Sequence, residues 1–224
     1  MECDLSGVVV RGVEVSGVDI DAPWLVHGEP LLVNGVDVTG YVEAELDGRF
    51  PGRAERRAST PEGLRAAWSS VEVAWDGAVD RAAALPQGSV NVSVAGEWSF
   101  AQTLRHLVYA TDMWLGKAVL QRAEPFHPLG LGDTSAQDEE GVPVATVDVP
   151  SYGDVLAAWA DRVRLVRSFL ATVTPDVLDE PRTNPHAAQH PENVRSCLHV
   201  VLEESWEHLR FALRDVETLA AGEP

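Results

Sequence analysis

Apolar residues recur with the period of an α-helix in four separate stretches between Thr60 and Ala220, and this pattern restricts the fold more than any other feature. The first stretch opens with clear start signals, because Thr60 can cap a helix and Pro61 suits the first helical position. Its apolar residues then follow an i, i+3, i+4 spacing to about Leu85. A stripe of this kind predicts a helix with one face in a core.

The other three stretches have the same helical period. Ser99 and Gln102 can form a capping box at the start of the second. Residues 124–150, between the second and the third, are rich in proline, glycine and acidic side chains and are predicted to form a long loop. The second to fourth helices are expected over residues 99–121, 151–173 and 191–220. Four long helices with extended connections predict a mainly α protein built as a four-helix bundle.

The first part of the chain repeats every five residues instead. Aligned, residues 4–23 read DLSGV, VVRGV, EVSGV and DIDAP. A five-residue period fits neither a helix nor a strand. The pattern resembles that of pentapeptide-repeat proteins, in which each repeat forms one side of a square coil and the central apolar residue points inward. Four repeats make only about one coil, whereas solenoids need several. An irregular or hairpin-forming Val/Gly segment is the open alternative.

After the repeat, Asn34 and Gly35 lie between two short apolar runs, which is favourable hairpin chemistry. Residues 41–46 could form a short helix, and the stretch FPGRAERRAS, residues 50–59, has the composition of a linker. The chain is therefore expected to have two parts, a pentapeptide-repeat-like β and coil extension with its linker over residues 1–58 and the helical bundle over residues 59–224.

The net charge of -18 argues against nucleic-acid partners, because a phosphate backbone repels such a surface and no stretch concentrates arginine and lysine. No apolar run approaches the roughly 18 to 20 residues that span a bilayer, so no membrane partner is expected. The N-terminus lacks the basic start of a secretion signal, which makes the cytoplasm the expected location. Cys3 and Cys197 lie far apart in the sequence, so a disulfide framework is not indicated.

The fourth predicted helix carries the first candidate chemistry. Glu204 and His208 are one turn apart and lie within about 40° of each other on a stripe that is otherwise apolar. His199 lies about 180° from His208 and cannot share this site. A carboxylate and an imidazole in this arrangement can chelate a metal ion. An ordinary helical ion pair is the alternative, and an acidic solvated face that includes Glu203 and Glu207 would look similar.

The second predicted helix adds His106, on a face of mostly small or apolar side chains. A single histidine in such a place is usually a hydrogen-bonded core residue. Three ionisable groups facing one core, however, are costly unless they are paired or bind a metal ion. His106 therefore favours a shared site with Glu204 and His208 without establishing it.

Two segments carry a resemblance to a known family: EWSFAQTLRHLVYATDMWLGKAVL and CLHVVLEESWEHLRFALRDVETL, residues 97–120 and 197–219. They are similar to the DinB-like superfamily, and most similar to its actinobacterial branch, which includes mycothiol-dependent maleylpyruvate isomerase and related thiol transferases. The resemblance covers residues 60–220. It implies an up-down-down-up bundle with metal ligands at His106, Glu204 and His208. Many members have three histidines, so Glu204 favours the isomerase-like branch.

What the resemblance implies for function is a divalent metal ion, with zinc expected and nickel, iron or manganese as alternatives. Three protein ligands leave a fourth position open, which is the geometry of catalytic sites. In the resembling branch this position serves a low-molecular-weight thiol, mycothiol. We therefore expect metal-assisted thiol transfer or thiol-dependent isomerisation of a small electrophile. A small-molecule hydrolase that uses metal-bound hydroxide is one alternative, and a non-catalytic metal-binding or interaction protein is another.

The surroundings of the site are predicted more coarsely, and no catalytic residue is assigned. His127 could reach the mouth of the site or be a plain loop residue. Arg105 and Arg210 are expected to point away from the metal face. Superfamily members often dimerise, so a homodimer is an open alternative to a monomer. The side chains expected to line a substrate pocket are Trp98, Gln102, Tyr109 and Cys197, the last more as inert packing than as a reactive thiol.

Overall fold

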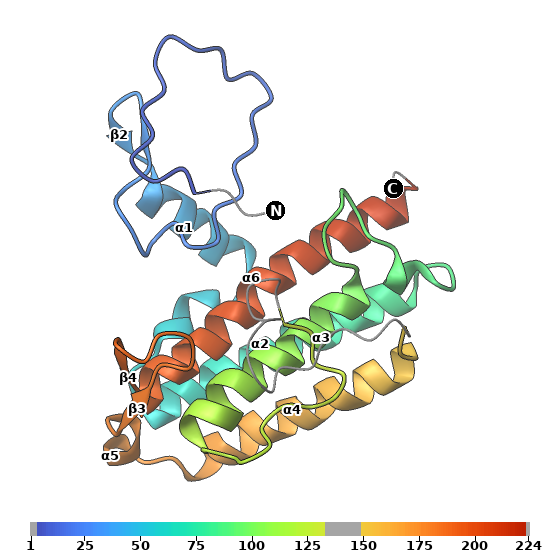
Figure 1. Ribbon diagram of the computed structural model, residues 1–224. Helices are drawn as coiled ribbons and strands as arrows, with labels where there is room; N and C mark the ends of the chain where they lie inside the picture. Colours follow the sequence, from blue (N-terminus) through green and yellow to red (C-terminus); the bar gives the residue numbers. More distant parts are fainter. Residues whose placement is uncertain (1–3, 133–148, 223–224) are drawn as a thin grey trace. The chain divides into compact units, whose positions relative to one another are not determined.

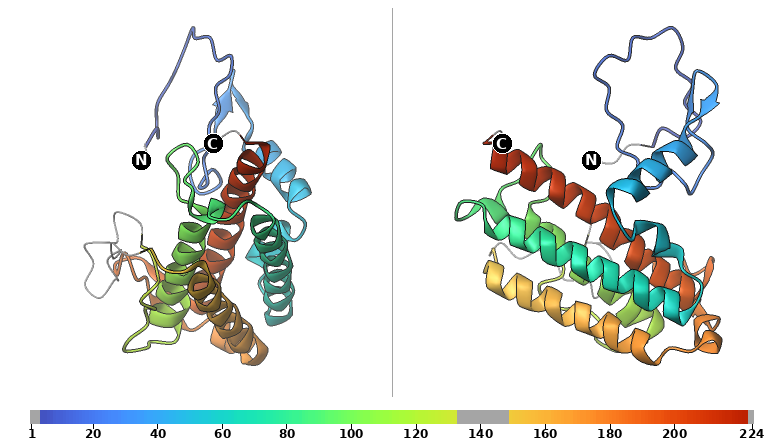
Figure 2. Two further views of the ribbon diagram at one scale, coloured as in Figure 1. Left: turned by 90° about the vertical axis from the view of Figure 1, so that its right-hand side faces the viewer. Right: turned by 180° about the vertical axis from the view of Figure 1, so that it is seen from behind.

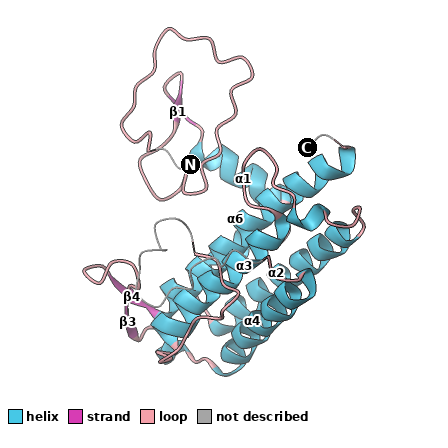
Figure 3. Cartoon of the chain, turned by 45° about the vertical axis from the view of Figure 1, so that its right-hand side comes forward, coloured by secondary structure: helices cyan, strands magenta, loops and turns pink. Residues whose placement is uncertain are grey.

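The computed structural model describes residues 4–132 and 149–222. The chain forms two compact units, Met1–Phe50 and Pro51–Pro224. Helices make up most of the described part of the second unit, with two short hairpins in the whole described chain (Figure 3). None of the described helices is both long and apolar enough to cross a membrane.

The first unit contains the predicted hairpin and the predicted helix. Strands β1 (Leu32–Val33) and β2 (Val36–Asp37) pair antiparallel. Asn34 and Gly35 between them both have positive φ angles, 51° and 80°, as the tight hairpin turn requires. Helix α1 (Thr39–Arg49) includes the predicted residues 41–46 and extends beyond them.

The five-residue repeat forms a regular series of turns. Gly7, Gly12 and Gly17 have φ angles of 73°, 66° and 73°. The backbone N–H of Val8 donates to the carbonyl of Leu5, and the same bond recurs ten residues later. A glycine with positive φ at the third residue of such a turn is the type II pattern, which explains the constant position of glycine. The pentapeptide-repeat resemblance itself stays a prediction.

The second unit contains the four predicted long helices. They are α2 (Pro61–Ala83), α3 (Phe100–Thr111) continued by the π-helix η3 (Asp112–Val119), α4 (Tyr152–Thr172) and α6 (Val194–Ala221). Their N-caps are Thr60, Ser99, Ser151 and Asn193, and each cap side chain accepts a hydrogen bond from the helix backbone. Ser99 and Gln102 form the predicted capping box. The helices are shown in Figure 1.

Shorter elements connect these helices, and two of them correct the sequence-based expectation. Residues 50–59 are not a plain linker: Arg53–Arg57 form the 3-10 helix η1, in which Arg53 and Arg56 are buried. The fourth long helix begins later than predicted because β4 (Pro191–Asn193) pairs with β3 (Pro181–Thr183). The remaining connecting elements are η2 (Ser89–Asn91) and α5 (Pro175–Leu178).

The directions of α2, α4 and α3 follow from pairs of contacts. Arg65 bonds to the carbonyl of Leu170 and Glu72 pairs with Arg167, so α2 and α4 are antiparallel. Phe100 lies beside Tyr152, and further along both helices Asp112 pairs with Arg162, so α3 and α4 are parallel.

Helix α6 completes the bundle. Trp75 contacts Ser205 and Arg81 pairs with Glu217, so α2 and α6 are parallel. It follows that α3 runs against α6, and the order along the chain is up, down, down, up. Seen from behind, α6, α2 and α4 lie side by side (Figure 2).

The four helices meet at Trp75, which is 1% exposed. Its indole N–H donates to the carbonyl of Ser205 on α6 at 3.0 Å. Its ring lies 6.1 Å from that of Phe100 on α3 and 5.7 Å from that of Trp159 on α4. Truncating a buried tryptophan of this kind costs about 3–5 kcal/mol. Trp75 thus fixes α3 and α6 relative to each other, and these are the two helices that carry the candidate site.

Candidate metal centre

The structure brings together the three predicted ligands, His106 from α3 and Glu204 and His208 from α6. One donor atom from each lies within 4.8 Å of the others. The Nε2 atom of His106 is 3.4 Å from Oε2 of Glu204, and Nε2 of His208 is 3.2 Å from the same oxygen. Donors around a tetrahedral ion at 2.0–2.1 Å are themselves about 3.3 Å apart. The two distances to Glu204 match this spacing, and the three donor types are those that a zinc-like ion prefers.

The orientation of His106 is fixed by a backbone group from the loop after η3. Nδ1 of His106 is 3.1 Å from the carbonyl oxygen of Leu131. A carbonyl oxygen only accepts hydrogen bonds, so Nδ1 carries the proton and donates it. Nε2 is then directed at Glu204 with its lone pair available to a metal ion. A second hydrogen bond of this kind is a regular partner of metal-binding histidines.

The electrostatics favour the protonation states that metal binding requires. Burial alone would raise the pKa of Glu204, but the two imidazoles beside it outweigh burial and hold that pKa far below its ordinary value of 4.5. Burial lowers the pKa of His208 below its ordinary value of 6.5. At neutral pH the site therefore offers a carboxylate and a neutral imidazole, which are the ligand forms.

The three ligand side chains are largely buried. The side chain of His106 is 9% exposed, and those of Glu204 and His208 are 16% and 17% exposed.

Trp98 lies over both imidazole rings. Its ring centroid is 4.6 Å from that of His106 and 5.9 Å from that of His208, and it is nearly parallel to the second. A tight turn places it there, in which Ala95 and Gly96 have φ angles of 52° and 81°. Trp98 was predicted to line the site, and in the structure it contacts two of the three ligands.

Tyr109 and Gln102 have different roles around the site. The ring of Tyr109 lies 6.0 Å from that of His106 and stacks on Phe126 from the following loop at 5.7 Å. Gln102 accepts a hydrogen bond from the backbone N–H of Ser99 through Oε1. Its carbonyl group therefore serves the capping box.

Cys197 is fully buried in the core. Burial raises the pKa of its thiol to about 12, with a further contribution from Glu192, while Arg182 acts in the opposite direction. A thiol of this kind stays protonated at neutral pH and is a poor nucleophile. The packing interpretation of Cys197 therefore fits the structure better than a reactive role. Cys3 lies outside the described residues.

The other histidine of α6 lies away from the site, as helical geometry predicts. His199 is 2.9 Å, through Nε2, from the carbonyl of Ala58, which makes Nε2–H the donor. Burial lowers the pKa of His199 below 6.5. His199 belongs to the contact between α6 and the segment that follows η1.

The acidic neighbours of Glu204 do not form a solvated face. Glu203 pairs with Arg57 at 2.6 Å and Glu207 with Arg53 at 3.2 Å, and both carboxylates are nearly buried. Arg210 also pairs with Glu207, at 3.1 Å. The arginines of η1, which sequence analysis assigned to a linker, thus neutralise the side of α6 next to the site.

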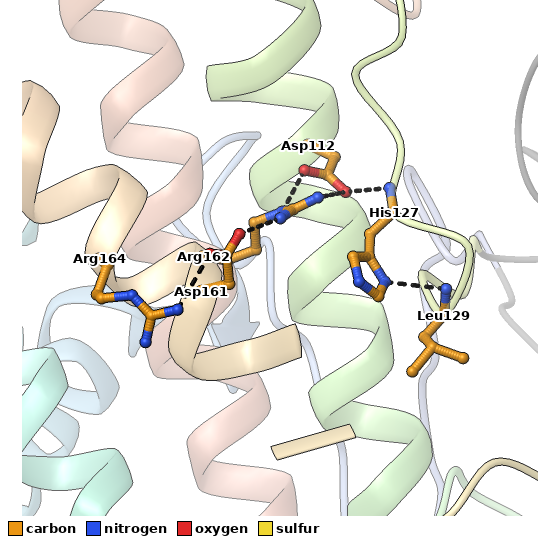
Figure 4. A network of polar contacts seen from close by, with 6 residues as sticks. All are labelled: Asp112, His127, Leu129, Asp161, Arg162 and Arg164. Atoms are coloured by element: carbon orange, nitrogen blue, oxygen red, sulfur yellow. Dashed lines mark hydrogen bonds and ion pairs between the residues drawn. The ribbon is translucent and has the colours of Figure 1, made fainter. Parts of the chain in front are cut away.

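The loop after η3 is held by hydrogen bonds with several side chains, and Figure 4 shows those of Asp112 and His127. Nδ1 of His127 accepts a hydrogen bond from the backbone N–H of Leu129, so this ring serves its own loop rather than the mouth of the site. The Nε–H of Arg105 donates to the carbonyl of Leu129 at 2.9 Å. The sequence did not point to Leu131, because a backbone carbonyl leaves no side-chain pattern. In the folded loop a Cβ at Gly130 would lie 3.2 Å from the carbonyl of His127, which is a property of the fold and not of the sequence.

Comparison with protein families gives a match that covers most of the chain. The sequence model of the DinB superfamily matches residues 49–212, which is more than half of the chain and includes all three candidate ligands. The chain therefore belongs to the DinB superfamily. Neither the curated proteins nor the solved structures gave a match.

Proposed function

We propose that this member of the DinB superfamily binds one divalent metal ion through His106, Glu204 and His208 and uses it in an enzymatic reaction. The reaction proposed is the transfer of a low-molecular-weight thiol, or a thiol-dependent isomerisation, on a small electrophile. The observation that supports a metal ion is the meeting of two imidazole Nε2 atoms and one carboxylate oxygen within 4.8 Å. Zinc suits this donor set, and nickel, iron and manganese are the alternatives.

The residues present would prepare the site for this chemistry. A bound divalent cation would lower the pKa of a thiol or water at the open fourth position. Leu131 directs Nε2 of His106 toward the position between the ligands, and Glu204 supplies the one negative charge. Trp98 covers the imidazole rings on one side and limits the access of water there.

A thiol in this reaction would come from a small co-substrate. Among the described residues the one free cysteine is Cys197, which is buried and has a raised pKa. The resemblance to the actinobacterial branch makes mycothiol the proposed co-substrate. A homodimer and a cytoplasmic location are further proposals from the sequence.

Metal binding is tested first. We expect the purified protein to bind zinc at one ion per chain in competition with a chromophoric chelator, and we expect His106→Ala and His208→Ala to lose this binding. His199→Ala is the matched control, because it removes a histidine from the same helix outside the site. Binding by His106→Ala with wild-type affinity would show that the ligand assignment is wrong. A wild-type protein that takes up neither zinc nor nickel would favour the non-catalytic class.

The reaction is tested with metal-loaded and metal-free protein and a small electrophile, with and without mycothiol. Thiol transfer predicts turnover that requires both the metal ion and the thiol. Metal-dependent turnover that is indifferent to every thiol tested would instead identify a hydrolase.

A further inference from the structure

The loop that orients His106 is attached to the bundle by apolar contacts and by a series of hydrogen bonds. A hollow of about 440 Å³ lies beside it, lined by residues from the loop and from α4, among them His127, Leu129 and Asp161. Residues 127–129 therefore have space between them and α4. Apolar contacts hold the loop on either side of this stretch, through Phe126 on Tyr109 and through the buried Leu131. Hydrogen bonds to α3 and η3 hold the stretch between them.

Three such hydrogen bonds hold the backbone of residues 127–131, which ends at the carbonyl that faces His106. The backbone N–H of His127 donates to Oδ2 of Asp112 at 2.8 Å, and the side chain of Arg105 donates to the carbonyl of Leu129 at 2.9 Å. The backbone N–H of Leu131 donates to the carbonyl of Arg105 at 3.1 Å. The carbonyl of Leu131 is then left facing Nδ1 of His106.

Asp112 is itself fixed by a buried ion pair. It is the first residue of η3 and is 0% exposed. Arg162 of α4 donates to both of its carboxylate oxygens, through Nε at 2.5 Å and through Nη2 at 3.1 Å (Figure 4). A bidentate pair of this kind holds both partners in one geometry. The carboxylate oxygen that receives His127 therefore cannot turn away.

We propose that Asp112, held by Arg162, and Arg105 are positioning residues for His106. They fix residues 127–131 so that the carbonyl of Leu131 accepts the Nδ1 proton and leaves Nε2 for the metal ion. Neither Asp112 nor Arg105 contacts the metal position, and each acts through the loop. The role of His106 as a ligand is taken from the proposed function, whereas its orientation by Leu131 is a property of the metal-free protein.

The experiment compares two variants that release the loop in different ways. Asp112→Leu with Arg162→Met removes the acceptor for His127 and both charges of the pair together, which leaves no unpaired buried charge. Arg105→Met removes the donor to Leu129 and keeps the ion pair. The control is Glu72→Leu with Arg167→Met, which removes an ion pair between α2 and α4 whose arginine is exposed.

We expect both test variants, and not the control, to exchange the backbone amides of residues 127–131 faster in the metal-free protein. Zinc affinity should fall by about 10-fold to 100-fold, the usual effect of removing a partner that orients a ligand. In ¹⁵N spectra of the imidazole rings, the neutral form of His106 should be protonated at Nδ1 in the wild type and shift toward protonation at Nε2 in both variants. The signal is assigned by its loss in His106→Gln.

Two results would overturn the proposal: faster amide exchange with unchanged zinc affinity, or an unchanged Nδ1–H form of His106 in both variants. If the double variant does not fold, Arg105→Met decides the question alone. If the wild type binds no metal ion, the proposed function fails, and the ring spectra of the metal-free proteins still decide whether the loop orients His106.

Discussion

Replacing Arg162 by methionine isolates the energetic cost of a buried carboxylate in this protein. Methionine keeps most of the apolar volume of the arginine stem but leaves Asp112, which is 0% exposed, with the backbone N–H of His127 as a donor and no counter-charge from Arg162. Removing one partner of a buried ion pair costs about 3–5 kcal/mol. Burial already raises the pKa of Asp112 in the wild type, although the hydrogen bonds from Arg162 and His127 act against it.

An upper limit follows from protonation. The carboxyl group can escape the cost of a buried charge by taking up a proton, and from its ordinary pKa of 3.8 this costs about 4 kcal/mol at pH 7. At pH 5.5 the same step costs only about 2 kcal/mol. The part of the unfolding free energy that Arg162→Met loses through the buried charge should therefore be at most about 4 kcal/mol at pH 7 and about 2 kcal/mol smaller at pH 5.5. The loss is larger at the higher pH, because an acid whose pKa is raised in the folded state makes the protein less stable as the pH rises.

Replacing Asp112, the other partner of the ion pair, provides the comparison. Asp112→Asn leaves Arg162 paired with Asp161 at 2.6 Å, so the guanidinium keeps a counter-charge. We expect a smaller loss, about 1–3 kcal/mol, without the change between pH 7 and pH 5.5. Urea unfolding followed by circular dichroism at the two pH values measures both variants, and both values lie above the pI of about 4.6. Equal losses for Arg162→Met at the two pH values would refute the reasoning.

Three further predictions concern the ligand, pH and the thiol. Zinc at about one hundred times its dissociation constant should stabilise the protein by about 2.7 kcal/mol and raise Tm by about 5–10 °C, and differential scanning calorimetry should show no such rise for His208→Ala. Because burial lowers the pKa of His199, the unfolded chain takes up a proton as the pH falls through 6.5 while the folded chain does not. Stability should therefore fall between pH 7.5 and 5.5, and urea unfolding should show a smaller fall for His199→Gln. In a Cys3→Ser background, Cys197 should react with a thiol reagent at pH 8 only after unfolding, since its pKa is about 12, and rapid labelling of the native protein would contradict its burial.

The sequence predicted what depends on neighbours along the chain. The four long helices were predictable because their caps and apolar spacing are local, as Thr60 and the capping box of Ser99 show. The relation between Glu204 and His208 was predictable for the same reason, since one turn of helix sets it. The exclusion of His199 from the site followed from the same helical geometry.

What the sequence did not predict depends on partners that are distant along the chain. In the sequence, the arginines of η1 lie in a stretch with the composition of a linker. Their partners Glu203 and Glu207 are about 150 residues away along the chain, so only the fold shows the pairing. His106 was joined to the site by a family resemblance, because its own helix cannot show what lies opposite. The carbonyl of Leu131 could not be found at all, since every residue has one and only the fold selects which carbonyl meets a histidine.

The three glutamates of α6 show why a metal site cannot be identified from acidic residues alone. The three side chains differ little in burial: those of Glu203, Glu204 and Glu207 are 8%, 16% and 10% exposed. They differ in the residues with which they pair. Glu203 and Glu207 pair with guanidinium groups, which are always charged and offer a metal ion no lone pair. Glu204 lies beside two imidazoles, which can donate a hydrogen bond or coordinate a metal ion as neutral rings. Glu204 therefore has two neighbours that can bind a metal ion together with it, and this locates the site.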